Sequence, residues 1–303
     1  MAVTNAPATR ARAAVMLGAA IAVGSVAFTL IKVVLRDVSP LTLAAGRVVF
    51  SALTFVAVVT AQPARRRPIE RADRWRVLAC GLGGSAGFHV LFSWGQREVS
   101  VAVAAIVLGT MPALVALGEV VVLRHRFGGR ALAGLALSLV GIAAISWRPD
   151  SGGHTSVPGM LAVAGATAVW AAVTVLTRSL GGRYDAWWLN TPGTVLGALV
   201  MIALAAPRAH ELRALPLSSW VWLVWLGSVS SAFVYAAMAY AVSVLPATTT
   251  ASLSTLVTPL SVVVAWVHLG ERPDRPTVVG VLAVAAGVAL VSTGAATERS
   301  SPT

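Results

Sequence analysis

Apolar residues occur along the chain in runs of about 18 to 23 residues, and short polar segments separate these runs. A run of about 20 apolar residues is long enough to cross the ~30 Å hydrocarbon layer of a bilayer as an α-helix. The polar segments between the runs are too short to form a soluble domain. The pattern therefore predicts an all-α polytopic membrane protein with ten transmembrane helices, which we place at residues 13–34, 41–61, 75–95, 99–123, 130–147, 157–178, 187–206, 219–241, 247–268 and 276–294.

Composition supports this fold class. Of the 303 residues, 57% are hydrophobic and 11% are charged, and the mean hydropathy is +0.82, whereas soluble domains are about 25% charged. The single cysteine, Cys80, lies in the third run and cannot form an intrachain disulfide. A short basic segment precedes the first run, as in a signal peptide, but this run exceeds 20 residues and nine others follow, so we expect a retained helix.

The distribution of arginine predicts the orientation of the chain, because loops on the cytoplasmic side of membrane proteins are enriched in Lys and Arg. With a cytoplasmic N-terminus, the inside segments hold Arg10, Arg12, Arg65, Arg66, Arg67, Arg71, Arg74, Arg76, Arg124, Arg126, Arg130, Arg178, Arg183 and Arg299. The outside segments hold half as many, namely Arg36, Arg97, Arg148, Arg208, Arg213, Arg272 and Arg275. We therefore expect both termini in the cytoplasm. The net charge of +12 does not indicate a nucleic-acid partner, because the only dense basic run lies between two spans.

An internal repeat divides the chain into two similar halves. Pro112 corresponds to Pro259 at an offset of 147 residues, and a pair of glycines repeats at an offset of 146, with Gly134 and Gly141 matching Gly280 and Gly287. Each copy contains five predicted helices. Because five is odd, the second copy must enter the membrane from the opposite face, which makes the copies inverted repeats. Inverted repeats are typical of secondary transporters, whose substrate site lies between the halves near the middle of the bilayer.

The expected organisation follows from this repeat. Residues 1–12 form a cytoplasmic tail, 13–148 the first five-helix repeat, 149–156 an external linker, 157–294 the second repeat and 295–303 a second cytoplasmic tail. The two matched prolines interrupt the fourth and ninth spans near their middle. A proline frees backbone carbonyls and bends a helix, so Pro112 and Pro259 are candidate bends along the transport route. The alternative is that they serve packing alone.

The second copy carries a more specific pattern. Pro259 is followed by an apolar segment, by the sequence Leu-Gly-Glu-Arg at residues 269–272, and by Gly280 and Gly287. This pattern resembles the EamA repeat of the drug/metabolite transporter superfamily over residues 13–294. The first copy departs from it, because Arg124-His125-Arg126 stands where Gly-Glu-Arg is expected. The resemblance implies two five-helix repeats around a central cavity, and traffic of small metabolites, most often export of amino acids or related compounds.

Three ionisable residues inside predicted spans are candidates for function, since such groups are costly in a membrane and usually face a cavity or a partner. Arg47 resembles the arginine commonly found in the second helix of the family. It lies about 9 Å along its span and could bind a substrate carboxylate or phosphate, or instead snorkel to the surface or pair with Asp37. His89 lies mid-span and could carry a coupled proton or serve packing. Glu119 could carry a proton or pair with Arg124 and Arg126.

Four aromatic residues within or near the bundle, Trp94, Trp170, Tyr235 and Tyr240, are candidates for stacking against a substrate. Tryptophans near span ends fit an interfacial belt instead. Lys32 and His268 lie near span ends and are expected to snorkel. Glu271 follows a glycine just beyond a helix end, where we expect it to cap a helix or pair across a loop rather than contact substrate.

The sequence contains no zinc, redox or nucleotide-binding motif, so we expect no catalytic residue, no metal, no cofactor and no enzymatic activity. The predicted function is secondary transport of small metabolites across the cell membrane by alternating access. Export of amino acids or related amphipathic compounds is the favoured direction and substrate class. A passive facilitator or channel, or a protein of this fold that transports nothing, is the alternative. The partners expected are a small-molecule substrate and the lipid bilayer; oligomeric state stays open.

Overall fold

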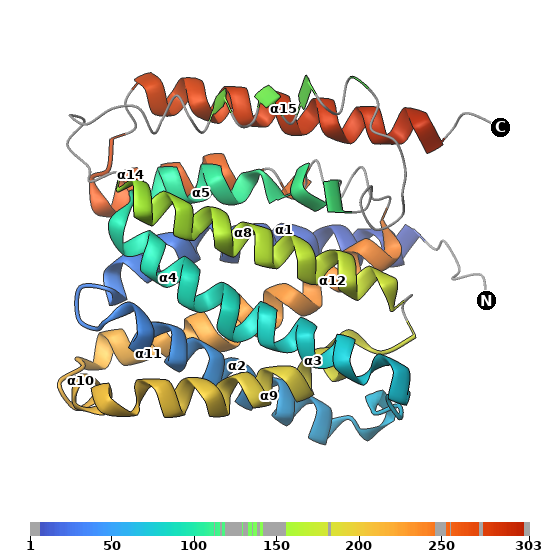
Figure 1. The fold of residues 1–303 in the computed structure, drawn as a ribbon, viewed down its shortest axis with the longest axis vertical. Coiled ribbons are helices and arrows are strands. Elements are labelled where there is room, and N and C mark those ends of the chain that lie inside the picture. Colours follow the sequence, from blue (N-terminus) through green and yellow to red (C-terminus); the bar gives the residue numbers. More distant parts are fainter. Residues whose placement is uncertain are drawn as a thin grey trace.

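The structure of the chain is a computed structural model, and most of the chain is helical in it (Figure 1). The residues described are 7–111, 113–115, 117, 118, 129, 133, 134, 136, 137, 140, 141, 156–180, 183–245, 253, 254, 256–272 and 275–299. Within these residues the regular secondary structure is entirely helical. Pro112, Glu119 and most of the fifth predicted span lie outside them.

Four of the predicted spans are single long helices. They are α1 (Pro7–Val34), α2 (Pro40–Ala61), α8 (Val157–Ser179) and α9 (Ala186–Ala205). The helix α9 continues through a short 3-10 turn into α10 (Ala209–Arg213).

Two further spans are each divided by a π-helical segment. In the first, α3 (Arg74–Leu82) and α4 (Phe88–Glu98) flank the π segment Gly83–Gly87. In the second, α11 (Leu217–Trp225) and α12 (Val234–Val244) flank the π segment Leu226–Phe233. Together with the four long helices, these make six helical stretches that are long and apolar enough to cross a membrane. Six of the predicted spans are thereby confirmed as apolar helices of membrane-spanning length.

Three shorter or partly described helices correspond to three of the four remaining predicted spans: α5 (Val101–Gly109), α14 (Val257–Leu269) and α15 (Arg275–Arg299). The total of ten transmembrane helices and the inversion of the repeats stay predictions. In Figure 1 the start of α1 and the end of α15 lie at the same end of the bundle.

Local sequence explains where several helices begin and end. Ser39 caps α2 by accepting from the backbone N–H of Thr42, and Pro40 occupies the first helical position, where no backbone donor is needed. Ser100 caps α5 through the N–H of Val103 at 3.2 Å. At the C-terminal end of α14, Gly270 adopts φ 70°, a left-handed conformation that glycine tolerates best, and this ends the helix.

The helices of the two halves interleave rather than form separate bundles. The first helix, α1, packs against α12 and α14 of the second half. In the same way α8, the first helix of the second half, packs against α4 and α5 of the first. The crossing of α2 with the π segment 226–233 is close, because a Cβ on Gly227 would lie 2.7 Å from the carbonyl oxygen of Arg47. Each half therefore depends on the other for its packing.

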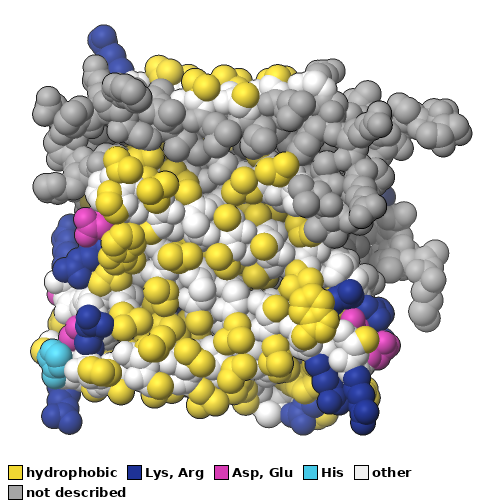
Figure 2. All heavy atoms as spheres, viewed as in Figure 1, with side chains coloured by type: hydrophobic (Ala, Val, Ile, Leu, Met, Phe, Trp, Pro, Cys, Tyr) yellow, Lys and Arg dark blue, Asp and Glu magenta, His cyan; other side chains and the backbone are white. Residues whose placement is uncertain are grey.

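Charged side chains lie mainly near the two ends of the bundle. Figure 2 shows apolar side chains across the middle of the visible face, with Lys, Arg, Asp and Glu near its two edges. We call the end formed by residues 62–76 and 183–188 the arginine-rich end, and the other, formed by residues 35–39, 97–100, 206–216 and 269–272, the opposite end. The apolar band between them is the surface that a bilayer would cover.

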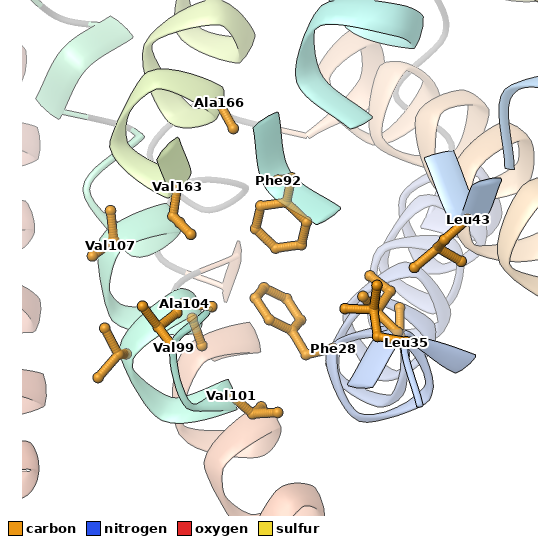
Figure 3. Packing of buried hydrophobic residues seen from close by; sticks show 14 of the residues in the cluster. Phe28, Leu35, Leu43, Phe92, Val99, Val101, Ala104, Val107, Val163 and Ala166 are labelled. Atoms are coloured by element: carbon orange, nitrogen blue, oxygen red, sulfur yellow. The ribbon is translucent and has the colours of Figure 1, made fainter. Parts of the chain in front are cut away.

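The largest apolar cluster lies toward the opposite end, where α1, α4, α5 and α8 meet. Phe28 and Phe92 face each other there edge to face, with ring centroids 5.5 Å apart. Figure 3 shows the two rings between the apolar side chains of α5 and α8, including Val107 and Val163, on one side and Leu35 and Leu43 on the other. This cluster closes the seam between α1 and α4.

Candidate functional site

Arg47 is buried in the interior of the bundle. It is the eighth residue of α2, about 10 Å along the axis from Pro40, and 4% of its surface is exposed. Its Nε and Nη1 atoms are buried without a hydrogen-bond partner in the described part of the chain. Asp37 accepts a hydrogen bond from the Ser219 hydroxyl instead of pairing with Arg47. Arg47 therefore neither snorkels to the surface nor forms the ion pair considered as the alternative.

His89 on α4 and Tyr235 on α12 lie near Arg47. Both α4 and the π segment 226–233, which leads into α12, pack against α2, and the two side chains are within electrostatic range of the Arg47 charge. His89 is 1% exposed, and its Nδ1 atom, like the hydroxyl of Tyr235, is buried without a described partner. Each residue is the second after a π segment, since these segments end at Gly87 and Phe233. π geometry inside α-helices is frequent at functional sites, and here the π segments occur in matched helices of the two repeats.

Aromatic rings connect these polar groups across the bundle. The Phe88 ring lies 5.2 Å from His89 and 5.2 Å from Trp170, measured between centroids. Trp170, on α8, lies 4.5 Å from the Tyr235 ring. We call Arg47, Phe88, His89, Trp170 and Tyr235 the central cluster. It combines a cation, two polar side chains and flat apolar surface, which suits a small amphipathic solute.

Four of the six cavity candidates from the sequence thus meet: Arg47, His89, Trp170 and Tyr235. The other two do not join them. Trp94 is 45% exposed on the outer surface of α4. Tyr240 lies further along α12, where the Arg12 guanidinium is 5.9 Å from its ring centroid. Neither residue therefore belongs to the central cluster.

Sequence reasoning missed a polar stripe on α4. Ser93 Oγ and Gln96 Oε1 are buried without described partners, as is Thr29 Oγ1 on the neighbouring α1. Gln96 is anchored by its Nε2 atom, which donates to the carbonyl of Phe28 at 2.7 Å. Positions 89, 93 and 96 follow the i, i+4, i+7 spacing that places residues on one helix face. That spacing is the signal that could have identified the stripe.

Pro259 lies at the third position of α14. Proline is tolerated in the first turn of a helix, because its missing N–H would have no intrahelical partner there. The backbone ladder resumes at Leu260, whose N–H donates to Leu256 at 3.2 Å. Pro112 and Glu119 are outside the described residues, so the roles expected for them stay predictions.

Two open pockets lie at the ends of the bundle. The pocket at the opposite end has a volume of about 280 Å³ and is lined by Lys32, Leu35, Arg36, Arg97, Leu269 and Glu271. The pocket at the arginine-rich end has a volume of about 630 Å³, and its lining includes Arg65, Arg67, Arg183 and Asp185. Among the described residues, no three His, Cys, Asp or Glu side chains gather as a metal site.

Polar contacts join the two halves at both ends. At the arginine-rich end, Asp73 is 3.0 Å from Arg183 and accepts from the Tyr184 hydroxyl at 2.8 Å. At the opposite end, Glu211 accepts from the backbone N–H of Ser39 at 2.8 Å. The Glu271 carboxylate accepts from the backbone N–H of Val101 at 2.9 Å. The expectation that Glu271 caps or pairs across a loop is confirmed.

Comparison with known proteins agrees with this architecture. A solved structure matches 97% of this chain and 99% of its own at a TM-score of 0.61 and 20% identity, which concerns the fold alone. A protein of Streptantibioticus cattleyicolor described as "Probable terminal-alkyne amino-acid exporter" is 31% identical over 75% of each chain. The "Uncharacterized transporter YdfC" of Bacillus subtilis is 26% identical over 86% of this chain and 85% of its own.

The family comparison covers nearly all of the helical part of the chain. The model of the EamA-like transporter family matches twice, over residues 12–147 and 157–293. Arg47 and His89 lie in the first match, and Trp170 and Tyr235 in the second, so the central cluster is built from both. The chain is a multi-pass membrane protein with two EamA repeats, and it belongs to the EamA-like transporter family, within the drug/metabolite transporters.

Proposed function

We propose that this transporter moves small metabolites, chiefly amino acids or related amphipathic compounds, by alternating access through the central cluster. The observation that carries the proposal is the position of this cluster between helices of both repeats, with unpartnered polar atoms on Arg47, His89 and Tyr235. Buried polar groups are normally hydrogen-bonded, and those left without a partner mark a site where another molecule can complete them. Family membership supplies the transporter class, and the amino-acid exporter named above supports the substrate class.

Alternating access requires that each end can open while the other stays closed. The contacts of Asp73 with Arg183 and of Glu271 with Val101 connect the repeats at the two ends, and they are suited to act as reversible closures. We propose that the repeats comprise residues 13–148 and 157–294, in inverted orientation, with the arginine-rich end facing the cytoplasm of a cell-membrane protein. The distribution of arginines supports this orientation.

The experiment is flux into proteoliposomes that hold the purified protein, with a pooled metabolite extract and detection of retained solutes by mass. Saturable movement of a few solutes, absent from empty liposomes, is the result expected. Unsaturable conduction would indicate a channel, and movement of no solute by folded protein would overturn the proposal. Because wild-type protein is compared with lipid alone, the result does not depend on any variant.

His89 is the titratable imidazole of the central cluster, so we propose it as the residue at which a coupled proton would bind. The same liposomes test this step under an imposed pH gradient. Coupling at His89 predicts that His89→Gln abolishes the response to the gradient while solute exchange between the two sides continues. An identical pH response in wild type and variant would exclude His89 from coupling.

A further inference from the structure

We infer that Arg47 binds the carboxylate of the transported solute, which makes amphipathic carboxylates the substrate class of this transporter. The inference rests on the proposed function and deepens it. Its basis is a buried guanidinium with two unpartnered nitrogens, at a place where the described protein provides no negative charge.

Every described carboxylate lies in a loop or at a helix end. The residues with described carboxylates are Asp37, Glu70, Asp73, Glu98, Asp185, Glu211 and Glu271. The ion pairs follow the same pattern, since they involve Arg65, Arg76, Arg183 and Arg208 near the two ends. Arg47 stands apart from all of them. A charge buried in the interior of a membrane protein is costly unless an opposite charge accompanies it, and a substrate carboxylate would supply that charge.

Arg47 offers more than one free donor to a carboxylate. A guanidinium is a planar fork of five N–H donors, and its charge-assisted hydrogen bonds to carboxylates are strong. Nε and Nη1 of Arg47 lie on different sides of this fork, and neither has a partner among the described residues, so each can donate to a carboxylate oxygen. The hydroxyl of Tyr235 and a ring N–H of His89 are further donors within the electrostatic range of Arg47.

The remainder of the cluster explains why the solute should also be amphipathic. The Trp170 ring, between Phe88 and Tyr235, offers flat apolar surface beside the cation. Ser93 Oγ and Gln96 Oε1, one and two turns along α4 from His89, are unpartnered acceptors that an ammonium group could use. A solute with a carboxylate, an apolar side chain and an optional amino group would therefore engage each of these features.

The polar stripe leads from the cluster toward a basic pocket. Gln96 is followed by Arg97, whose carbonyl accepts from Lys32 Nζ at 3.4 Å. Lys32, Arg36 and Arg97 line the 280 Å³ pocket at the opposite end, where one oxygen of Glu271 is already bonded to Val101. A pocket with excess positive charge raises the local concentration of anions. This end is therefore suited to admit or release a carboxylate.

The test uses matched solutes that share one side chain. L-phenylalanine, 3-phenylpropanoate, phenylalaninamide and phenethylamine differ only in whether the carboxylate and the amino group are present, and L-leucine, 4-methylpentanoate and leucinamide form an aliphatic series. Flux in proteoliposomes and ligand-induced thermal stabilisation of the purified protein are both measured. We expect the carboxylates of at least one series to be moved and to stabilise the protein, and the amide and amine of that series to do neither.

Three variants locate this preference. Arg47→Met should weaken carboxylate binding by about 30-fold or more, and Arg47→Lys should weaken it by about 10-fold, because lysine keeps the charge but loses the planar fork of N–H donors. Tyr235→Phe should weaken binding by roughly 3- to 10-fold. Arg74→Met, at an exposed arginine of the arginine-rich end, is the matched control and should bind as wild type does.

Thermal stability without ligand separates a binding role from a structural one. Removing an uncompensated buried charge should leave the unfolding temperature of Arg47→Met unchanged or higher than that of wild type. A clear decrease, or failure of this variant to fold, would indicate that Arg47 has a structural partner and would overturn the inference.

The two proposals fail in different ways. If wild-type protein moves solutes from the metabolite extract, but none of them is a carboxylate, or if Arg47→Lys and Tyr235→Phe retain the full preference for carboxylates, the inference about Arg47 is wrong while the transport function stands. If folded wild-type protein moves nothing, both are wrong.

Discussion

The carboxylate of Glu271 accepts a hydrogen bond from the backbone N–H of Val101, with 2.9 Å between oxygen and nitrogen and 170 positions between the residues. Val101 is the first residue of α5, so its N–H has no partner within the helix. The bond is assisted by the charge of Glu271, which also lies favourably near the positive end of the helix dipole. The Glu of the Leu-Gly-Glu-Arg motif therefore joins the end of α14 to the start of α5.

This contact predicts a loss of stability in Glu271→Ala. The free energy of unfolding should fall by about 1–2 kcal/mol, while Glu271→Gln, which keeps an oxygen acceptor, should lose about half as much. Thermal unfolding of the purified protein in detergent measures the difference. Glu98→Ala removes a carboxylate at the same end and serves as the control for charge. Equal stability of Glu271→Ala and wild type would show that the bond contributes nothing.

Hydrophobic run length predicted the six long helical stretches because bilayer thickness dictates how long an apolar helix must be. The position of Glu271 after a glycine predicted its loop contact. Which side of a helix faces the interior was harder to predict, because the lipid face of a membrane helix is as apolar as its buried face. Trp94 lies on the outer surface and its neighbour Ser93 is buried, and hydropathy alone could not decide between them.

The two π segments were also beyond sequence reasoning. Both occur in stretches rich in small residues, Gly83–Gly87 and Leu226–Phe233, but such residues are common in membrane helices for packing reasons. The π geometry is fitted to neighbours from the other half of the chain, as Gly227 shows by its contact with Phe50 and Arg47. Local sequence does not contain that information.

Gly227 yields a second prediction. A Cβ added there would lie 2.5 Å from Phe50 Cβ and 2.7 Å from the carbonyl oxygen of Arg47, so α2 would have to move. We expect Gly227→Ala to lower the free energy of unfolding by about 1–3 kcal/mol and to reduce flux, because the displaced helix carries Arg47. Thermal unfolding and proteoliposome flux measure the two effects.

The control for this substitution is Gly18→Ala on α1. An added Cβ at Gly18 meets nothing within 4 Å. Alanine is favoured over glycine in helices by up to ~1 kcal/mol, so this variant should be as stable as wild type or more so. If both variants behaved alike, close packing at Gly227 would not be required.

Trp170 yields a third prediction. Its ring contacts Phe88 and Tyr235 within the central cluster, so Trp170→Ala should remove apolar surface that the solute uses. We expect transport at low solute concentration to fall about 10-fold or more, corresponding to a loss of at least ~1.4 kcal/mol in binding. Trp170→Phe should retain more activity than alanine. The measurement is the dependence of initial flux on solute concentration.

Trp94→Ala is the matched control, because Trp94 is 45% exposed and lies outside the cluster. It should leave the concentration dependence of flux unchanged. A loss of flux in Trp94→Ala as large as in Trp170→Ala would place the transport route elsewhere.

Asp73 yields the last prediction, which concerns closure of the arginine-rich end. Its carboxylate is 3% exposed and lies between Arg183, at 3.0 Å, and the Tyr184 hydroxyl, at 2.8 Å. Asp73→Ala should destabilise this end by about 1–3 kcal/mol, less than breaking a fully buried pair, because the Arg183 side chain is 43% exposed. Hydrogen exchange should accelerate in residues 62–76 and 183–188 and stay unchanged in 97–100 and 206–216 at the opposite end.

The control for Asp73 is Glu70, which also pairs with Arg183 but at 3.5 Å and with 66% of its side chain exposed. Exposed ion pairs contribute about 0–1 kcal/mol, so backbone amide hydrogens should exchange nearly as fast in Glu70→Ala as in wild type. If closure of this end limits transport, Asp73→Ala should also raise the share of molecules that are open there. A cysteine-reactive probe should then label the cysteine introduced by Ala64→Cys faster. Faster exchange at both ends alike would instead indicate that Asp73 supports the whole fold rather than one closure.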